Sequence, residues 1–129
     1  IVVDYLQMIR SANPKEHREA QVADISRNMK VMARSCGVPV VWVAQLNRES
    51  EKDKRRPRMS DLRESGAIEQ DTDKGILIHD PEPADGDRPV ERRVELIVDK
   101  QRNGPTGPVE VWYAANVMRF ENLPRGPGY

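Results

Sequence analysis

Val38-Pro39-Val40-Val41-Trp42-Val43-Ala44 is a continuous apolar run, and it gives the clearest indication of fold class in the chain. A strand with one face in water alternates apolar and polar residues, whereas a continuous run is typical of a parallel sheet that is covered on both faces. The run therefore predicts a buried strand of a parallel sheet over residues 38–44.

The segments upstream of this run complete a strand-helix-strand unit. Ile1-Val2-Val3 is a second aliphatic run, and Ser11-Ala12-Asn13-Pro14 after it has turn chemistry. Residues 16–35 carry apolar side chains at helical spacing, and Gly37 followed by Pro39 is a typical helix end. We therefore expect one βαβ unit, whose helix has an apolar face made of Val22, Ile25, Met29, Met32, Ala33 and Cys36.

The last third of the chain has the alternation of an antiparallel sheet. Residues 94–99 and 109–114 alternate in side-chain character, and the turn residues 103–107 lie between them. This pattern predicts a β-hairpin. Residues 75–79 predict another short buried strand, and residues 80–88 an excursion. We expect a last strand at residues 117–120 and a disordered tail at residues 124–129.

Composition limits the class of protein. The chain has 129 residues, enough for one domain, and its 21 basic and 21 acidic side chains give no net charge, so any DNA contact must be local. Cys36 is the only cysteine, which excludes an internal disulfide and fits a reducing compartment, and we expect it to be buried. No apolar run approaches the ~20 residues that span a bilayer, so we expect a cytoplasmic protein without a membrane segment.

Polar side chains follow both predicted parallel strands. Asp4 comes directly after Ile1-Val2-Val3, and Gln45 follows residues 38–44. Because α/β proteins bind ligands at the carboxyl ends of neighbouring parallel strands, we expect these two side chains at one sheet edge. A carboxylate there can hold Mg²⁺ through water, and an amide can hydrogen-bond a phosphate or the attacking water. Ordinary polarity at a strand end is the alternative for both.

Two segments after Gln45 are rich in charge. Residues 48–59 mix both signs without periodicity, so they fit a solvated loop and a DNA-facing loop equally well. In residues 61–71 we expect short helical turns, with Ser60 as the cap and Gly66 as an interruption. Arg63 and Gly66 suit a DNA phosphate, because a guanidinium pairs with it and a backbone without Cβ approaches it closely. A salt-bridge network at a helix end is the alternative.

Four segments in this order resemble the C-terminal half of the ATPase domain of DnaB-family replicative helicases. They are Asp4-Tyr5-Leu6-Gln7-Met8, Gln45-Leu46-Asn47-Arg48, the segment at residues 61–71, and Lys100-Gln101-Arg102-Asn103-Gly104-Pro105. The resemblance spans nearly the whole chain. It implies a RecA-like α/β fold over residues 1–123, with a mostly parallel central sheet, flanking helices and a C-terminal antiparallel β-hairpin.

The resemblance also implies a role for each candidate residue. Asp4 is the carboxylate that holds Mg²⁺, usually through water, and Gln45 is a catalytic residue near the γ-phosphate. Lys100 and Arg102 act in trans, as cations inserted into the ATP site of the adjacent subunit. Nucleotide binding is implied for the turn Lys100, Gln101, Arg102, Asn103 and Gly104, and DNA binding for Arg48, Arg63, Glu64 and Gly66.

The implied function is translocation on single-stranded DNA and duplex unwinding in replication, driven by ATP with Mg²⁺. Such a motor is a homo-hexamer whose further partners are a primase and a helicase loader, at replication forks in the bacterial nucleoid. Residues 1–129 contain neither a G-x-x-x-x-G-K-[ST] phosphate loop nor the strand with the catalytic Glu, so we expect a piece truncated on its N-terminal side that is inactive alone. The alternatives are another RecA-like repair or recombination ATPase, and a non-catalytic remnant that retains DNA-binding and subunit surfaces.

Overall fold

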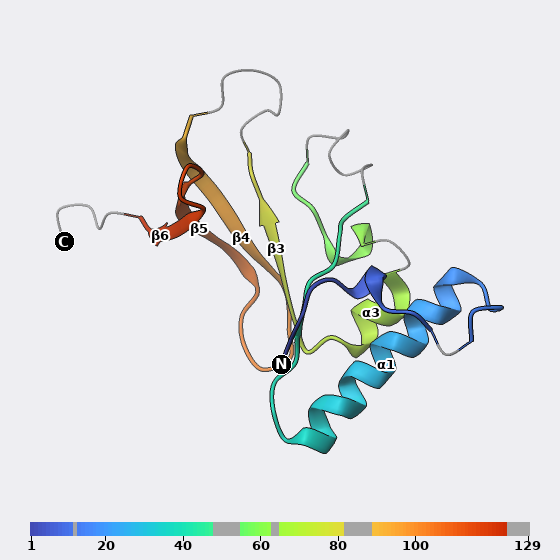
Figure 1. Cartoon of the computed structure of the whole chain (residues 1–129). Coiled ribbons are helices and arrows are strands. Elements are labelled where there is room, and N and C mark those ends of the chain that lie inside the picture. Colours follow the sequence, from blue (N-terminus) through green and yellow to red (C-terminus); the bar gives the residue numbers. More distant parts are fainter. Residues whose placement is uncertain (12, 48–54, 63–64, 82–88, 124–129) are drawn as a thin grey trace. The chain divides into compact units, whose positions relative to one another are not determined.

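The computed structural model describes residues 1–11, 13–47, 55–62, 65–81 and 89–123 (Figure 1). The tail predicted at residues 124–129 lies outside these ranges. The chain divides into two compact units, Ile1–Asp73 and Lys74–Tyr129. The first unit holds β1 (Val2–Val3), η1 (Leu6–Met8), α1 (Arg18–Cys36), β2 (Val41–Trp42), η2 (Met59–Asp61) and α3 (Ser65–Asp71). The second holds β3 (Lys74–His79), β4 (Glu91–Gln101), β5 (Gly107–Ala114) and β6 (Arg119–Asn122).

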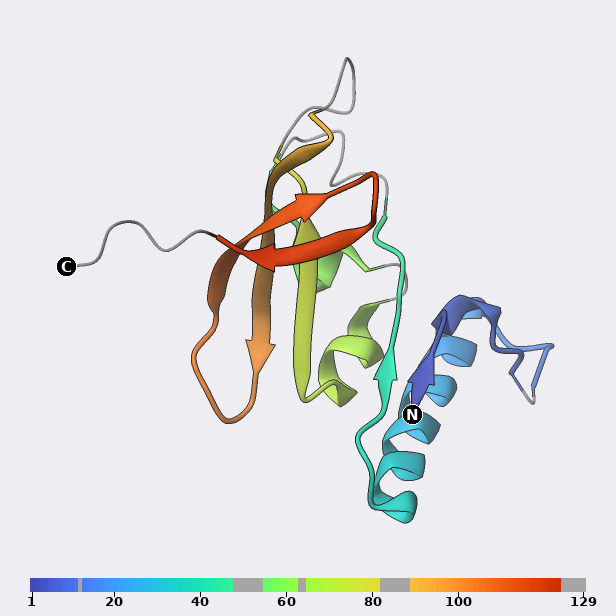
Figure 2. The ribbon, with the colours of Figure 1, turned by 60° about the vertical axis from the view of Figure 1, so that its left-hand side comes forward.

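The predicted strand-helix-strand unit is confirmed. β1 and β2 pair in parallel, with Val2 opposite Val41 and Val3 opposite Trp42, and Figure 2 shows both strands pointing the same way beside α1. A parallel pair needs a long crossover between its strands, and α1 supplies it. The carboxyl ends of β1 and β2 therefore lie at the same edge.

The prediction that the apolar run at residues 38–44 is buried on both faces is wrong for the described residues. Regular strand structure covers only Val41–Trp42, and Val41 is 57% exposed while Val2 on the neighbouring strand is 75% exposed. A strand in a parallel sheet is buried on both faces only where further elements cover it. The described residues leave these side chains open to solvent.

α1 spans Arg18–Cys36, close to the predicted range. Val22 and Ile25 on its apolar face are buried. Gly37 ends the helix as predicted, with a left-handed φ of 64° and an N–H that donates to carbonyl groups of the last turn. Cys36 is exposed, which corrects the expectation of a buried thiol. It is the last residue of the helix, beyond the part that carries the buried side chains.

Helical turns are confirmed at Met59–Asp61 and Ser65–Asp71, but their details differ from the prediction. Arg58, not Ser60, precedes η2, and Ser60 lies inside that turn. Gly66 does not interrupt a helix, because it lies in the first turn of α3. Glycine is tolerated there because the first N–H groups of a helix have no intrahelical partner. α3 lies beside α1 (Figure 1), and Ile68 of α3 is buried.

The second unit is a four-stranded antiparallel sheet in the order β3-β4-β5-β6. It confirms the predicted hairpin, formed by β4 and β5, with β3 on one side and β6 on the other. β3 confirms the strand predicted at residues 75–79, but Ile76 and Ile78 in it are exposed, so it is not the buried strand expected. The last strand comes later than predicted, at Arg119–Asn122, because Val117 and Met118 belong to the turn before it. The core side chains of this unit are Leu77, Val94, Ile97, Val111 and Ala114.

Candidate functional site

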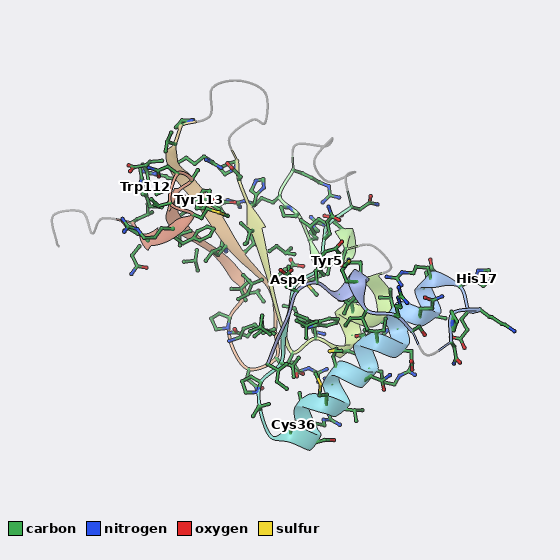
Figure 3. The ribbon with its side chains drawn as sticks, viewed as in Figure 1. Asp4, Tyr5, His17, Cys36, Trp112 and Tyr113 are labelled. Carbon is green, nitrogen blue, oxygen red and sulfur yellow. The ribbon has the colours of Figure 1, made fainter. Side chains whose placement is uncertain are left out.

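Asp4 directly follows β1, and its side chain is exposed. The chain stays bound to β2 on both sides of it, because Val43 N–H donates to Val3 O at 2.9 Å and Leu6 N–H donates to Val43 O at 2.8 Å. Leu6 is fully buried and anchors the η1 turn. Figure 3 shows Asp4 and Tyr5 at the end of β1 away from the N-terminus. The carboxylate is thus held at a fixed edge and open to solvent.

Gln45 follows β2 at the same edge, and it too is exposed. The two strand ends predicted to carry polar groups are therefore neighbours in the sheet. Immediately after Gln45 the backbone enters a contact that sequence patterns did not reveal. Leu46 forms an isolated antiparallel bridge with Leu62, and Asn47 N–H donates to Asp61 O at 2.7 Å.

Asp61 is the most strongly held carboxylate among the described residues of this region. Its two oxygens each accept a hydrogen bond of 2.7 Å from the Arg55 guanidinium, and Oδ2 also accepts the Arg58 N–H at 2.8 Å. The Arg55 hydrogen bond is the largest cause that holds the pKa of the Asp61 carboxyl below its usual range, and the Arg58 N–H adds to it while burial opposes it. Asp61 therefore remains ionised at neutral pH.

The predicted DNA segment is described in part. Arg48, Arg63 and Glu64 lie outside the described residues, so their roles stay predictions. Gly66 is exposed on α3, and a Cβ built on it meets no atom within 4 Å. The helix backbone at this position is therefore accessible to a ligand, as close approach to a phosphate requires.

α3 is tied to α1 by a polar network that the sequence analysis missed. Ser26 Oγ donates to Asp71 Oδ2 at 2.9 Å, and Lys30 Nζ donates to Asp71 O at 2.8 Å and to Asp73 Oδ1 at 3.0 Å. Ser26 is 1% exposed. Its position one turn after Val22 on the apolar face was a signal, because a buried hydroxyl needs a partner.

Lys100 and Gln101 end β4, and Arg102, Asn103 and Gly104 form the turn before β5. Lys100 is partly buried, whereas Arg102 is exposed. Gln101 Nε2 donates to Pro105 O at 3.3 Å, so its amide folds over the turn. A Cβ at Gly104 would clash with that amide. The turn belongs to the second unit, whereas Asp4 and Gln45 belong to the first.

The donor set at Asp4 is a single carboxylate. No group of three or more His, Cys, Asp or Glu side chains that would hold a metal occurs in the described part of the chain. One carboxylate still fits Mg²⁺, because this ion usually keeps several waters and is held by one or two carboxylates together with substrate phosphates. In the same residues, no helix is long and apolar enough to cross a membrane.

The family of the DnaB-like helicase C terminal domain matches residues 1–122. The chain belongs to this family. The replicative DNA helicase DnaB of Mycobacterium leprae is 44% identical to it over 97% of the chain, and DnaB of Geobacillus stearothermophilus is 42% identical over 97%. The chain spans 21% and 28% of the length of these two relatives.

Two solved structures share the fold. One is an ATPase domain that aligns with a TM-score of 0.85 and 37% identity, covering 95% of this chain and 44% of that one. The other is the structure of a DnaB-like replicative helicase and its interactions with primase. It aligns with a TM-score of 0.86 and 36% identity, and the alignment covers 95% of this chain and 30% of that one. The predicted family and the predicted RecA-like fold are confirmed, and the individual site assignments stay predictions.

Proposed function

We propose that the complete protein carrying this chain is a replicative DNA helicase, with these residues as the C-terminal part of its motor domain. The family match over residues 1–122 carries the proposal. The position of Asp4 and Gln45 after neighbouring parallel strands supports it, because nucleotide hydrolases use that sheet edge. ATP hydrolysis would drive movement along single-stranded DNA and separation of the duplex.

Asp4 and Gln45 would serve the nucleotide. Asp4 would hold Mg²⁺ through water, and the bound ion neutralises charge on the phosphates of ATP. The Gln45 amide, exposed in the segment that follows β2, would donate to the γ-phosphate or orient the attacking water. Both side chains would thus act on the phosphate end of the nucleotide.

Lys100 and Arg102 would complete the ATP site of an adjacent subunit. Arg102 is exposed in a turn that β4 and β5 hold as a hairpin, which suits a cation that must reach another chain. Gln101, Asn103 and Gly104 would shape that turn against the nucleotide, and the Gln101–Pro105 hydrogen bond supports this. Cations so placed stabilise the charge that develops on a transferred phosphoryl group.

Single-stranded DNA would bind along Arg48, Arg63, Glu64 and Gly66. The open surface at Gly66 supports backbone contact with phosphates. With a net charge of zero, the chain depends on these local groups for DNA affinity. Contact with the phosphate backbone suits a motor that moves on any sequence.

The functional assembly would be a homo-hexamer, as membership of the family implies. A closed ring agrees with a cation supplied in trans, because every ATP site then has a neighbour. One similar helicase has been solved with its interactions with primase, and we propose a primase and a helicase loader as partners here. The place of action would be the replication fork in the cytoplasm.

ATP hydrolysis by the complete gene product tests the proposal. We expect Mg²⁺-dependent hydrolysis that single-stranded DNA stimulates, and loss of hydrolysis in Asp4→Asn. Asp24→Asn, the same substitution on the surface of α1, is the matched control and should retain the activity. Salt-sensitive DNA binding without hydrolysis would instead identify a non-catalytic remnant, and strand exchange without unwinding a recombination ATPase.

A further inference from the structure

Asp61 contacts three other residues at once, through its side chain and its backbone. Its carboxylate binds the Arg55 guanidinium through two hydrogen bonds of 2.7 Å and accepts the Arg58 N–H at 2.8 Å. Its own carbonyl oxygen accepts the Asn47 N–H at 2.7 Å. The Asp61 side chain is 12% exposed and that of Arg55 is 42% exposed. A two-pronged ion pair of this geometry is stronger and more directional than an ordinary surface pair.

The residue next to Asp61 extends the contact. Leu62 is 8% exposed, donates its N–H to Met59 O at 3.1 Å and forms the bridge to Leu46. Leu46 is adjacent to Gln45, and Leu62 is adjacent to Arg63. The segment that contains Gln45 and the segment that leads to Arg63 are therefore joined by the Leu46–Leu62 bridge and by the hydrogen bond from Asn47 N–H to Asp61 O.

We infer that Asp61 is a positioning residue that couples these two sites, which rests on the proposed function. By fixing Arg55 and the amide of Arg58, the carboxylate sets the η2 turn. That turn presents the Asp61 carbonyl and the Leu62 backbone to residues 46–47. A change at Gln45 is thereby transmitted through residues 46–47 to the backbone of Asp61 and Leu62, which directly precede the proposed DNA segment in the chain. Asp61 itself contacts neither nucleotide nor DNA.

The test compares Asp61→Asn with Arg55→Ala and Arg55→Lys in the complete gene product. Asp61→Asn keeps the shape of the side chain and removes its charge. Arg55→Lys keeps a cation and loses the two-pronged geometry, so it should retain part of the coupling that Arg55→Ala loses. Asp24→Asn on α1, where the native carboxylate accepts a 3.2 Å hydrogen bond from the neighbouring Asn28 on the same helix, is the matched control.

Two readouts separate coupling from simple loss of structure. The first is the ratio of DNA-stimulated to basal ATP hydrolysis, which we expect to fall about 10-fold in Asp61→Asn, a usual size for coupling between sites. Basal hydrolysis should stay within about 2-fold of wild type, because the ATP contacts are unchanged. The second is hydrogen exchange, which should accelerate at the Asn47 and Leu62 amides and remain unchanged in β4 and β5.

Equal loss of basal and stimulated hydrolysis would overturn the coupling role, since a merely structural defect lowers both. Unchanged exchange at Asn47 would overturn it as well, because the bridge would then not depend on the carboxylate. If the wild-type protein does not hydrolyse ATP at all, the proposed function fails. Hydrogen exchange at the Asn47 amide then decides alone whether the Asp61 carboxylate holds the contact between η2 and residues 46–47.

Discussion

The backbone of Leu46 pairs with that of Leu62 in an isolated antiparallel bridge. Each leucine is the immediate neighbour of a proposed functional residue, Gln45 in one case and Arg63 in the other. In this chain the bridge would provide a physical path between the segment proposed for the nucleotide and the segment proposed for DNA. We expect substitutions that weaken it to change the response of ATP hydrolysis to DNA.

Arg102→Ala should lower ATP hydrolysis by about 10³-fold or more, the usual effect of removing a cation that stabilises the transferred phosphoryl group. ATP binding and hexamer formation should remain, because Arg102 lies in an exposed turn rather than in a core. Steady-state hydrolysis, nucleotide binding and gel filtration measure the three properties. Arg93→Ala is the control, since Arg93 is exposed on β4, the strand that precedes the Arg102 turn, and its ion pair with Glu110 is long, at 3.9 Å.

Mixing inactive subunits shows whether Arg102 acts in trans. Asp4→Asn subunits lack the carboxylate proposed for Mg²⁺, and Arg102→Ala subunits lack the cation proposed for the neighbouring ATP site. In random mixed hexamers, about one quarter of the interfaces combine an intact Asp4 with an intact Arg102 of the neighbour. Hydrolysis should reappear on mixing. Mixed hexamers that stay inactive would show that both residues serve the same subunit's site.

Gly66→Ala should separate helix stability from DNA affinity. Alanine fits the space around Gly66 and raises helix propensity, so α3 should gain up to about 1 kcal/mol of stability. Affinity for single-stranded DNA should nevertheless fall about 10-fold, because the Cβ blocks a backbone hydrogen bond to a phosphate. Hydrogen exchange in α3 and fluorescence anisotropy with labelled DNA measure the two effects.

Gly37→Ala is the counterpart of that variant. Gly37 has a φ of 64°, which an L side chain adopts at a cost of about 1–2 kcal/mol, so α1 should lose stability while DNA affinity stays constant. Undiminished DNA affinity in Gly66→Ala would remove Gly66 from the DNA surface. Equal loss of affinity in both variants would show that affinity merely follows stability.

Ser26→Ala should loosen α3. The Ser26 hydroxyl donates to the Asp71 carboxylate, and a hydrogen bond to a charged group contributes about 1.5–3 kcal/mol. Exchange of the α3 amides should therefore accelerate roughly 10-fold or more. Ser35→Ala is the same substitution at an exposed position of the same helix and should leave α3 unchanged. Similar exchange in both variants would show that the Ser26–Asp71 contact contributes nothing.

The ion pair of Asp61 should give a specific pH dependence. Its folded-state pKa lies below the ordinary value of 3.8, so the folded state binds a proton less readily than the unfolded state. The resulting stabilisation is complete well above pH 3.8 and is lost as the pH falls through the lower, folded-state value. The difference in thermal midpoint between wild type and Asp61→Asn should be constant near neutral pH and shrink below about pH 4. A difference that grows on acidification would contradict this assignment.

Local patterns predicted the elements that depend on nearby residues. The run at residues 38–44 and the aliphatic Ile1-Val2-Val3 indicated the parallel pair, and the alternation around residues 103–107 indicated the hairpin. Gly37 indicated the end of α1, because a left-handed position has a local signature. Asp4 and Gln45 were expected at one edge because parallel strands align their carboxyl ends.

The partners of individual side chains and backbone groups could not be predicted from local patterns. Asp61 is one of many acidic residues, and the sequence around it does not indicate that the Arg55 guanidinium and the Asn47 N–H are its partners. Ser60 was favoured as a cap on residue type alone, yet the carboxylate of Asp61 accepts the hydrogen bond from the residue that precedes η2. Exposure of Val41 depends on which elements cover the strand, and a run of apolar residues does not specify that.

Strand separation by the complete gene product tests the central claim most directly. A forked duplex with a labelled strand is incubated with the wild-type protein or Arg102→Ala, with and without ATP and Mg²⁺. We predict separation by the wild type that requires ATP, and none by Arg102→Ala despite retained DNA binding. A wild-type protein that binds the fork but never separates its strands in the presence of ATP would contradict the assignment of this chain to a working helicase motor.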